Sequence, residues 1–181
     1  MHASLQTDIL GKLSADQKKI LIVCVETGAR LSEIANLIPD AIRLNDDVPH
    51  IVIEPVTTGK SKRAVKNKQS IRTVPLVGAA LHVMRQHPNG FPKYRDKGDT
   101  ISANVGSYLK RRNFLLKGQT GVHSLRHSIK DRLREANIDE ALIKAIHGHA
   151  EDGIVYGTGF TLERKREALE AVALPFDEGV V

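Results

Sequence analysis

The chain has 181 residues, 41% of them hydrophobic, which is enough to bury the core of one domain and argues against a disordered protein. Its 27 Lys and Arg against 21 Asp and Glu give a net charge of +6, a modest excess that suits a polyanionic partner without proving one. One cysteine excludes an internal disulfide, and the short apolar runs exclude a membrane helix of roughly 20 residues, so we expect a cytoplasmic protein with no membrane contact.

The first predicted helix begins near residue 14. Ser14 followed by Gln17 forms a capping box, and the apolar residues from Ile20 to Val25 continue the helix. Cys24 lies inside this apolar stretch and is expected in the core. Gly28 is expected to end the helix in a left-handed conformation.

The middle of the chain predicts one sheet. Two β-branched segments, His50–Glu54 and Ser70–Leu76, read as antiparallel strands joined by a long loop. From Lys60 to Arg72 the chain holds six basic residues and no acid, a run that on its own is as typical of a solvated loop as of a phosphate-binding one. Helices are expected before and after the sheet, at Ser32–Leu37, Gly78–Gln86, Ser102–Leu116, Ser124–Ala136, Asp139–Ile146 and Leu162–Val172. The sequence thus predicts an α+β fold, mostly helical, with a small antiparallel sheet and a single domain over residues 1–181.

Five motifs occur in an order that resembles the catalytic domain of tyrosine recombinases, the phage integrase family. They are TGARLSEIANL, the strand segment SIRTVPL, HSLRH, HGHA and a tyrosine that follows. Each motif alone is a weak signal, but their order and spacing over nearly the whole chain make a strong one. The resemblance implies a mostly helical catalytic domain with a small sheet at one side. Because the chain starts almost directly at its first helix, we expect the family's N-terminal core-binding domain to be absent from it.

Two arginines, Arg30 and Arg126, are the candidates for holding a phosphate. Attack on a phosphodiester builds negative charge on the nonbridging oxygens, and a guanidinium offers these oxygens a fixed pair of donors that lysine lacks. Loss of one such donor is expected to cost roughly 3 to 4 kcal/mol of transition-state stabilisation. A lone Arg30 would be read as a partner of Glu33, but beside the other motifs we expect Glu33 to orient a catalytic Arg30.

Tyr156 is the expected nucleophile, and His123 and His149 are expected to assist it. His123 lies three residues before Arg126, on the same side of a helix start, and His149 follows a glycine that ends the preceding helix. A phenol with a pKa near 10 needs a proton acceptor and nearby positive charge to attack near neutral pH. The resemblance implies a covalent 3′-phosphotyrosine and a free 5′ hydroxyl. The gap between His149 and Tyr156 is shorter than most of the family show, so whether Tyr156 acts in its own subunit or in a neighbour stays open.

A lysine of the basic loop is expected to protonate the leaving 5′ oxygen. The family uses a hairpin lysine for this role, and Lys66 or Lys68 lies where the strand ending in TVPL puts it. Lys66 is preferred, because the Lys-Asn pair resembles the usual Lys-Thr pair of the motif. No cofactor, metal or ATP is expected to take part.

Three other readings of the sequence stay open at this point. The segment Ile129–Ile146 has two short helices with a tight turn, so the chain could be a noncatalytic helix-turn-helix DNA-binding protein. A metal-dependent phosphohydrolase with zinc on His123, His127, His147 and His149 is a second reading, although no acidic or cysteine ligand accompanies these histidines. A type IB topoisomerase shares the chemistry, but the strand motif is closer to integrases.

The expected partner is double-stranded DNA. We expect a monomer in free solution, a homotetramer on DNA, and association with the nucleoid when DNA is bound. After Tyr156, the segment TLERKREALEAVAL has the spacing of an amphipathic helix, which we expect to pack on its own core rather than on a neighbour.

Overall fold

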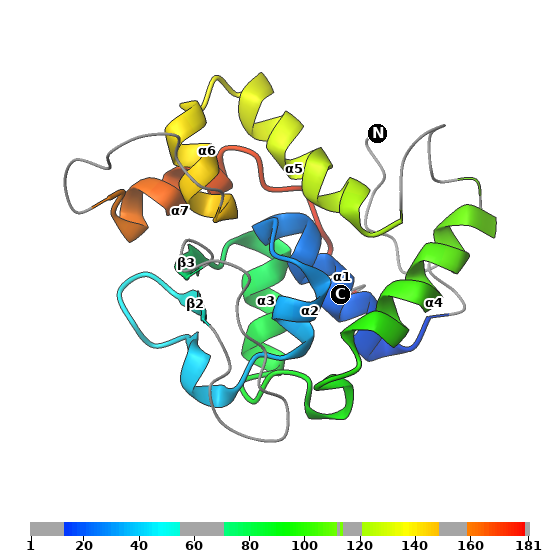
Figure 1. Ribbon diagram of the computed structural model, residues 1–181. Helices are drawn as coiled ribbons and strands as arrows, with labels where there is room; N and C mark the ends of the chain where they lie inside the picture. Colours follow the sequence, from blue (N-terminus) through cyan, green and yellow to red (C-terminus); the bar gives the residue numbers. More distant parts are fainter. Residues whose placement is uncertain (1–12, 55–70, 112, 114–120, 149–158, 180–181) are drawn as a thin grey trace.

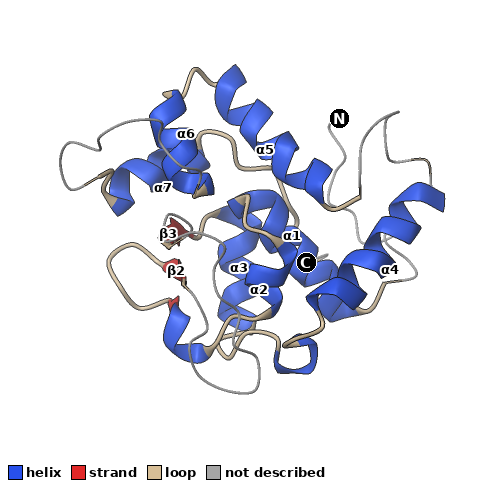
Figure 2. Cartoon of the chain, in the orientation of Figure 1, coloured by secondary structure: helices blue, strands red, loops and turns tan. Residues whose placement is uncertain are grey.

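The computed structural model describes residues 13–54, 71–111, 113, 121–148 and 159–179 (Figure 1). These residues form mostly helices and a three-stranded antiparallel sheet in the order β1-β2-β3 (Figure 2). The helices are α1 (Ala15–Thr27), α2 (Leu31–Ala35), α3 (Gly78–Gln86), α4 (Gly98–Arg111), α5 (His123–Glu135), α6 (Glu140–His147) and α7 (Leu162–Glu170), and the strands are β1 (Ile42–Arg43), β2 (His50–Ile53) and β3 (Arg72–Pro75). The predicted α+β fold with a small antiparallel sheet is confirmed.

Helix α1 begins and ends as its sequence predicts. The backbone N–H of Ser14 donates to the side chain of Gln17 at 3.0 Å, and the Ser14 hydroxyl accepts from the Gln17 N–H at 3.3 Å, which completes the capping box. At the other end Gly28 adopts φ +67° and donates to the Cys24 carbonyl at 2.9 Å. The left-handed stop places Arg30 at the start of α2.

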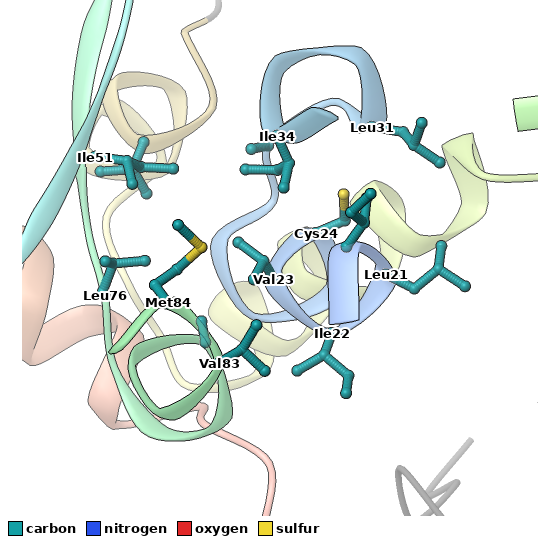
Figure 3. Packing of buried hydrophobic residues seen from close by; sticks show 14 of the residues in the cluster. Leu21, Ile22, Val23, Cys24, Leu31, Ile34, Ile51, Leu76, Val83 and Met84 are labelled. Atoms are coloured by element: carbon teal, nitrogen blue, oxygen red, sulfur yellow. The ribbon is translucent and has the colours of Figure 1, made fainter. Parts of the chain in front are cut away.

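The core lies around α1, which packs against α2, α3 and α5. Val23 of α1, Ile34 of α2 and Met84 of α3 gather in one apolar layer, and none of them is exposed (Figure 3). Cys24 is buried in the same layer, as predicted, and burial raises the pKa of its thiol well above the ordinary value. Cys24 is therefore a packing residue.

The sheet lies beside this core and brings one charged residue into it. In β3 the alternation of the strand turns Arg72 and Val74 to the buried side, and Arg72 pairs in register with Ile53 of β2. Helices α6 and α7 both contact β3, and Lys165 of α7 donates to the Thr73 carbonyl at 3.2 Å. Strand β1 was not predicted, because a strand of two residues is too short to show an alternating pattern in the sequence.

Helix α4 begins earlier than the sequence predicts, at Gly98 rather than Ser102. A Cβ atom on Gly98 would lie 2.9 Å from the Cβ of Ser32, so the close contact between α4 and α2 requires glycine here. A glycine in sequence reads as a helix breaker, which is why the start was misplaced.

The predicted amphipathic helix packs on the protein's own core, in which Ala168 and Leu169 of α7 are buried, and the segment after α7 also contacts that core. The Leu174 N–H donates to the Glu26 carboxylate of α1 at 3.4 Å, and the rings of Phe176 and His82 lie 5.7 Å apart. Arg132 of α5 donates to the carbonyls of Val172 and Val25, and these hydrogen bonds connect the segment after α7 to α1. Among the helices of the described ranges, none is both long enough and apolar enough to span a bilayer.

Candidate active site

Glu33 of the TGARLSEI motif lies among three arginines, which we call the arginine cluster: Arg30, Arg72 and Arg126. One carboxylate oxygen accepts from the Arg30 guanidinium at 2.7 Å, and the other accepts from the Arg30 backbone N–H at 2.7 Å. Arg72 donates to both oxygens, at 3.2 and 2.8 Å. Burial alone would raise the pKa of Glu33, but the hydrogen bonds and charges of Arg72 and Arg30 outweigh it and hold this pKa below its ordinary value. Glu33 is therefore an anion that fixes two guanidiniums, and its predicted pairing with Arg30 is confirmed.

Arg72 is the site residue that the motifs did not single out. Its side chain is 3% exposed, and its Nε donates to the Ile146 carbonyl of α6 at 3.0 Å. It also passes close to the left-handed turn at Gly148, where an added Cβ would lie 2.8 Å from the Arg72 Cδ. Arg72 is the last residue of the basic run, so it was interpreted as part of a basic loop. Its spacing from Val74 and Leu76, however, puts it on the apolar face of the strand.

Arg126 joins the ends of two helices. One guanidinium nitrogen donates to the Gly28 carbonyl after α1, and the other donates to the His147 carbonyl at the end of α6. Burial, followed by the nearby charges of Arg72 and Arg30, lowers the pKa of Arg126 to about 10. Arg126 therefore stays charged at neutral pH, and the three guanidiniums are close enough to interact.

His123 lies three residues before Arg126 on α5. It is the first residue of α5, it is exposed, and Arg126 follows one turn later on the same helix. The predicted placement of the pair at one helix start is confirmed. Their roles toward a phosphate stay predictions.

The cluster carries more positive than negative charge. Arg30, Arg72 and Arg126 bring three charges against the one of Glu33, which leaves a net charge of +2. Arg72 and Arg126 are buried, whereas 40% of the Arg30 side chain is exposed. An oxyanion approaching the protein would therefore meet Arg30 first, with the two buried cations behind it.

Four of the predicted site residues lie outside the described part of the chain. These are Lys66 and its alternative Lys68, together with His149 and Tyr156. Gly148, the described residue that directly precedes His149, ends α6 with φ +65°, as the HGH motif predicted. Their places in the site stay predictions.

The alternative zinc site is only partly described, because His149 is one of its four histidines. Within the described ranges, no three His, Cys, Asp or Glu side chains gather closely enough to hold a metal ion. His147 is buried, and its Nδ1 is 3.0 Å from the Ile143 carbonyl.

Residues 1–157 of the chain match the family model of the phage integrase family. The chain belongs to this family. Among solved structures it resembles the integrase of mycobacterium phage Brujita, with a TM-score of 0.61 and 17% identity over 95% of this chain and 57% of that one. It also resembles the Tn1549 transposon integrase in complex with transposon right end DNA, with a TM-score of 0.58 and 18% identity over 92% and 62% of the two chains. A third similar structure is the XerH site-specific recombinase bound to difH substrate, with a TM-score of 0.55 and 19% identity over 91% and 47%.

These likenesses confirm the fold of a tyrosine-recombinase catalytic domain. This phage integrase family member spans about half to three fifths of the length of the solved proteins that it resembles. No curated protein matches it in sequence.

Proposed function

We propose that this chain carries the catalytic centre of a site-specific DNA recombinase or integrase. It would cut and rejoin DNA strands through a covalent 3′-phosphotyrosine, without metal or ATP. The observation that carries the proposal is that Arg30 and Arg126 come from two separate family motifs and meet at one place in the fold. Arg126 donates to the carbonyl of Gly28, two residues before Arg30, and Glu33 holds the Arg30 guanidinium. A charged cluster of this kind suits a phosphodiester as its ligand.

In this proposal the two arginines bind the nonbridging oxygens of the scissile phosphate. Negative charge grows on these oxygens as the phosphorus passes through its pentacoordinate state, and donors already held in place stabilise it more than mobile water does. The hydrogen bonds of Arg30 to Glu33 and of Arg126 to two backbone carbonyls supply this preorganisation. His123, exposed at the start of α5, would donate to the same phosphate.

The covalent step is assigned to Tyr156. Its hydroxyl loses a proton to His149 and attacks phosphorus, the bond to the 5′ oxygen breaks, and Lys66 gives the leaving oxygen a proton. The step replaces the phosphoester bond to the 5′ oxygen with a phosphoester bond to Tyr156. A 5′ hydroxyl can therefore attack this new ester and restore a DNA strand without ATP. These roles come from the motifs, since Lys66, His149 and Tyr156 lie outside the described residues.

Double-stranded DNA is the proposed partner. The net charge of +6 suits it, and two of the structures that resemble this chain are DNA complexes. We further propose a monomer in free solution that assembles as a homotetramer on DNA, with the protein on the nucleoid when bound.

A covalent adduct is the decisive test. The purified chain is incubated with a library of nicked suicide duplexes randomised around the nick, and denaturing electrophoresis separates any protein–DNA adduct. We expect an adduct that survives EDTA and disappears in Tyr156→Phe. Tyr94→Phe and Tyr108→Phe are matched controls, because both rings are buried in the core, and both are expected to keep the adduct.

The same assay separates the two readings that involve no covalent intermediate. DNA binding without an adduct would identify a noncatalytic DNA-binding protein. Cleavage that EDTA abolishes, again without an adduct, would identify a metal-dependent phosphohydrolase. Either result overturns the proposed function.

A further inference from the structure

Arg72 links two parts of the site that come from distant segments of the chain. Through Glu33 it reaches Arg30 at the start of α2, and through the Ile146 carbonyl it reaches the last turn of α6. We propose that Arg72 is a positioning residue of the strand-transfer reaction, which sets Arg30 and the Gly148 turn at a fixed separation. This inference rests on the proposed function.

The first link runs through the carboxylate of Glu33. Arg72 donates to both oxygens, so the forked guanidinium fixes the plane of the carboxylate as well as its position. The same two oxygens accept from the side chain and the backbone of Arg30. Because 40% of the Arg30 side chain is exposed, solvent leaves it free to change rotamer unless Glu33 holds it. Arg72 therefore limits the positions that Arg30 can adopt.

The second link runs to the end of α6. The Nε of Arg72 donates to Ile146, whose carbonyl lies in the last turn, where a helix has unpaired acceptors and partial negative charge. The side chain then passes so close to Gly148 that a Cβ there would lie within 2.9 Å of one of its nitrogens. The residue that follows Gly148 is His149, the expected proton acceptor. Arg72 therefore holds the Gly148 turn, which directly precedes His149 in the sequence.

Arg72 acts through these residues and not by contact with DNA. Only 3% of its side chain is exposed, so a phosphate cannot reach it without displacing neighbouring atoms. Lysine would keep the charge, but one ammonium cannot pair with both Glu33 oxygens and the Ile146 carbonyl in this geometry. Arg72→Lys therefore removes the positioning while it keeps the positive charge that favours DNA.

The test compares Arg72→Lys with Arg132→Lys. Arg132 is a matched control, because it too pairs with a buried carboxylate, Glu26, and donates to two backbone carbonyls. These partners belong to α1 and to the segment after α7 and not to the Glu33–Arg30 pair. Single-turnover cleavage is measured on the suicide duplex that the wild-type chain enriches, at a temperature where unfolding curves show every variant folded. DNA affinity is measured separately by anisotropy with the same duplex, in a Tyr156→Phe background that prevents cleavage.

We expect Arg72→Lys to slow cleavage by about 10- to 100-fold, since small misplacements of catalytic groups have effects of this size. Its DNA affinity should stay within about twofold, because the charge is kept and the side chain is buried. Arg132→Lys should cleave at nearly the wild-type rate. Wild-type cleavage by Arg72→Lys, or a loss confined to DNA affinity, or an equal loss in Arg132→Lys, would overturn the positioning role while leaving the proposed function intact.

A second variant covers the case in which Arg72→Lys does not fold. Glu33→Asp keeps the charge and shortens the connection between Arg72 and Arg30 by one methylene, so it should slow cleavage to a similar extent. Where both variants fold, their double variant should be no slower than the slower single one, because both break the same connection. Additive losses would overturn the link through Glu33. Absence of an adduct from the wild-type chain itself would instead refute the proposed function, and the role of Arg72 with it.

Discussion

Arg126 donates a hydrogen bond to the carbonyl of Gly28, 98 residues earlier in the chain. Its other terminal nitrogen donates to the His147 carbonyl, so one guanidinium joins the end of α1 to the end of α6. The residue that we expect to bind the scissile phosphate thus also stabilises the packing of the end of α1 against the end of α6. Substitutions in this site should therefore affect stability and cleavage together.

Arg126→Lys should reduce both. A lysine can satisfy one of the two buried carbonyls, and leaving the other without a donor costs about 1 to 3 kcal/mol of unfolding free energy. The loss of the phosphate fork should slow cleavage by about 10²- to 10³-fold. Urea unfolding and single-turnover cleavage measure the two effects. Arg134→Lys, at a half-exposed arginine that pairs with Glu140, is the control and should leave both the unfolding curve and the cleavage rate close to wild type.

Gly28→Ala should destabilise the fold. The left-handed φ of +67° costs a residue with a Cβ about 1 to 2 kcal/mol, and that Cβ would lie 2.8 Å from the Nε2 of His147. We expect a loss of about 2 kcal/mol or more in urea unfolding. Gly106→Ala in α4, where a Cβ meets nothing within 4 Å, should instead raise stability by up to about 1 kcal/mol. Equal effects of the two alanines would contradict the role of the turn.

Glu33→Gln should destabilise the fold mainly above acidic pH. The pKa of Glu33 is lowered in the folded state, so its contribution is present above the ordinary value of 4.5 and is lost as pH falls through the folded pKa. Removing the carboxylate leaves two guanidiniums without their anion, which should cost about 3 kcal/mol at pH 7. Urea unfolding from pH 3 to 7 should show the two proteins converging toward low pH. Glu163→Gln, at an exposed position of α7, should follow the wild-type curve throughout.

Glu26 should give the opposite pH trend. Burial raises its pKa to about 7, although Arg132 and the Leu174 N–H act against the rise. A carboxyl whose pKa is raised in the folded state stabilises fully below its ordinary pKa, and this stability is lost as pH rises from 4.5 through 7. The shift corresponds to roughly 3 kcal/mol. Glu26→Gln should remove this decline, and an unchanged slope between pH 5 and 8 would show that Glu26 is not protonated in the fold.

The parts of the fold that the sequence predicted have local causes. Ser14 with Gln17 gives the start of α1, and Gly28 and Gly148 give two helix ends, because each signal acts within a few residues. Helix α3 was predicted with its observed bounds, since its apolar residues repeat with the helical period over the whole segment.

The parts that were missed depend on distant neighbours. Glycine is required at residue 98 because Ser32 lies against it, and nothing near residue 98 in the sequence shows this contact. Arg72 looked like one more charge of a basic loop, because its partners Glu33 and Ile146 are 39 and 74 residues away. For the site, the motifs predicted that Arg30 and Arg126 would converge. The third arginine, Arg72, is part of the SIRTVPL motif, but its burial and its pairing with Glu33 were not predicted.

The long-range hydrogen bonds of the arginine cluster affect when the cluster can form during synthesis of the protein. The hydrogen bond of Arg126 to Gly28 spans 98 residues of the chain, and that of Arg72 to Ile146 spans 74. While the ribosome is still synthesising the protein, the early segments have no partner to close against until α6 has emerged from the exit tunnel. A chain whose synthesis has not yet passed α6 therefore lacks the assembled cluster, and we expect it to be unable to cleave DNA.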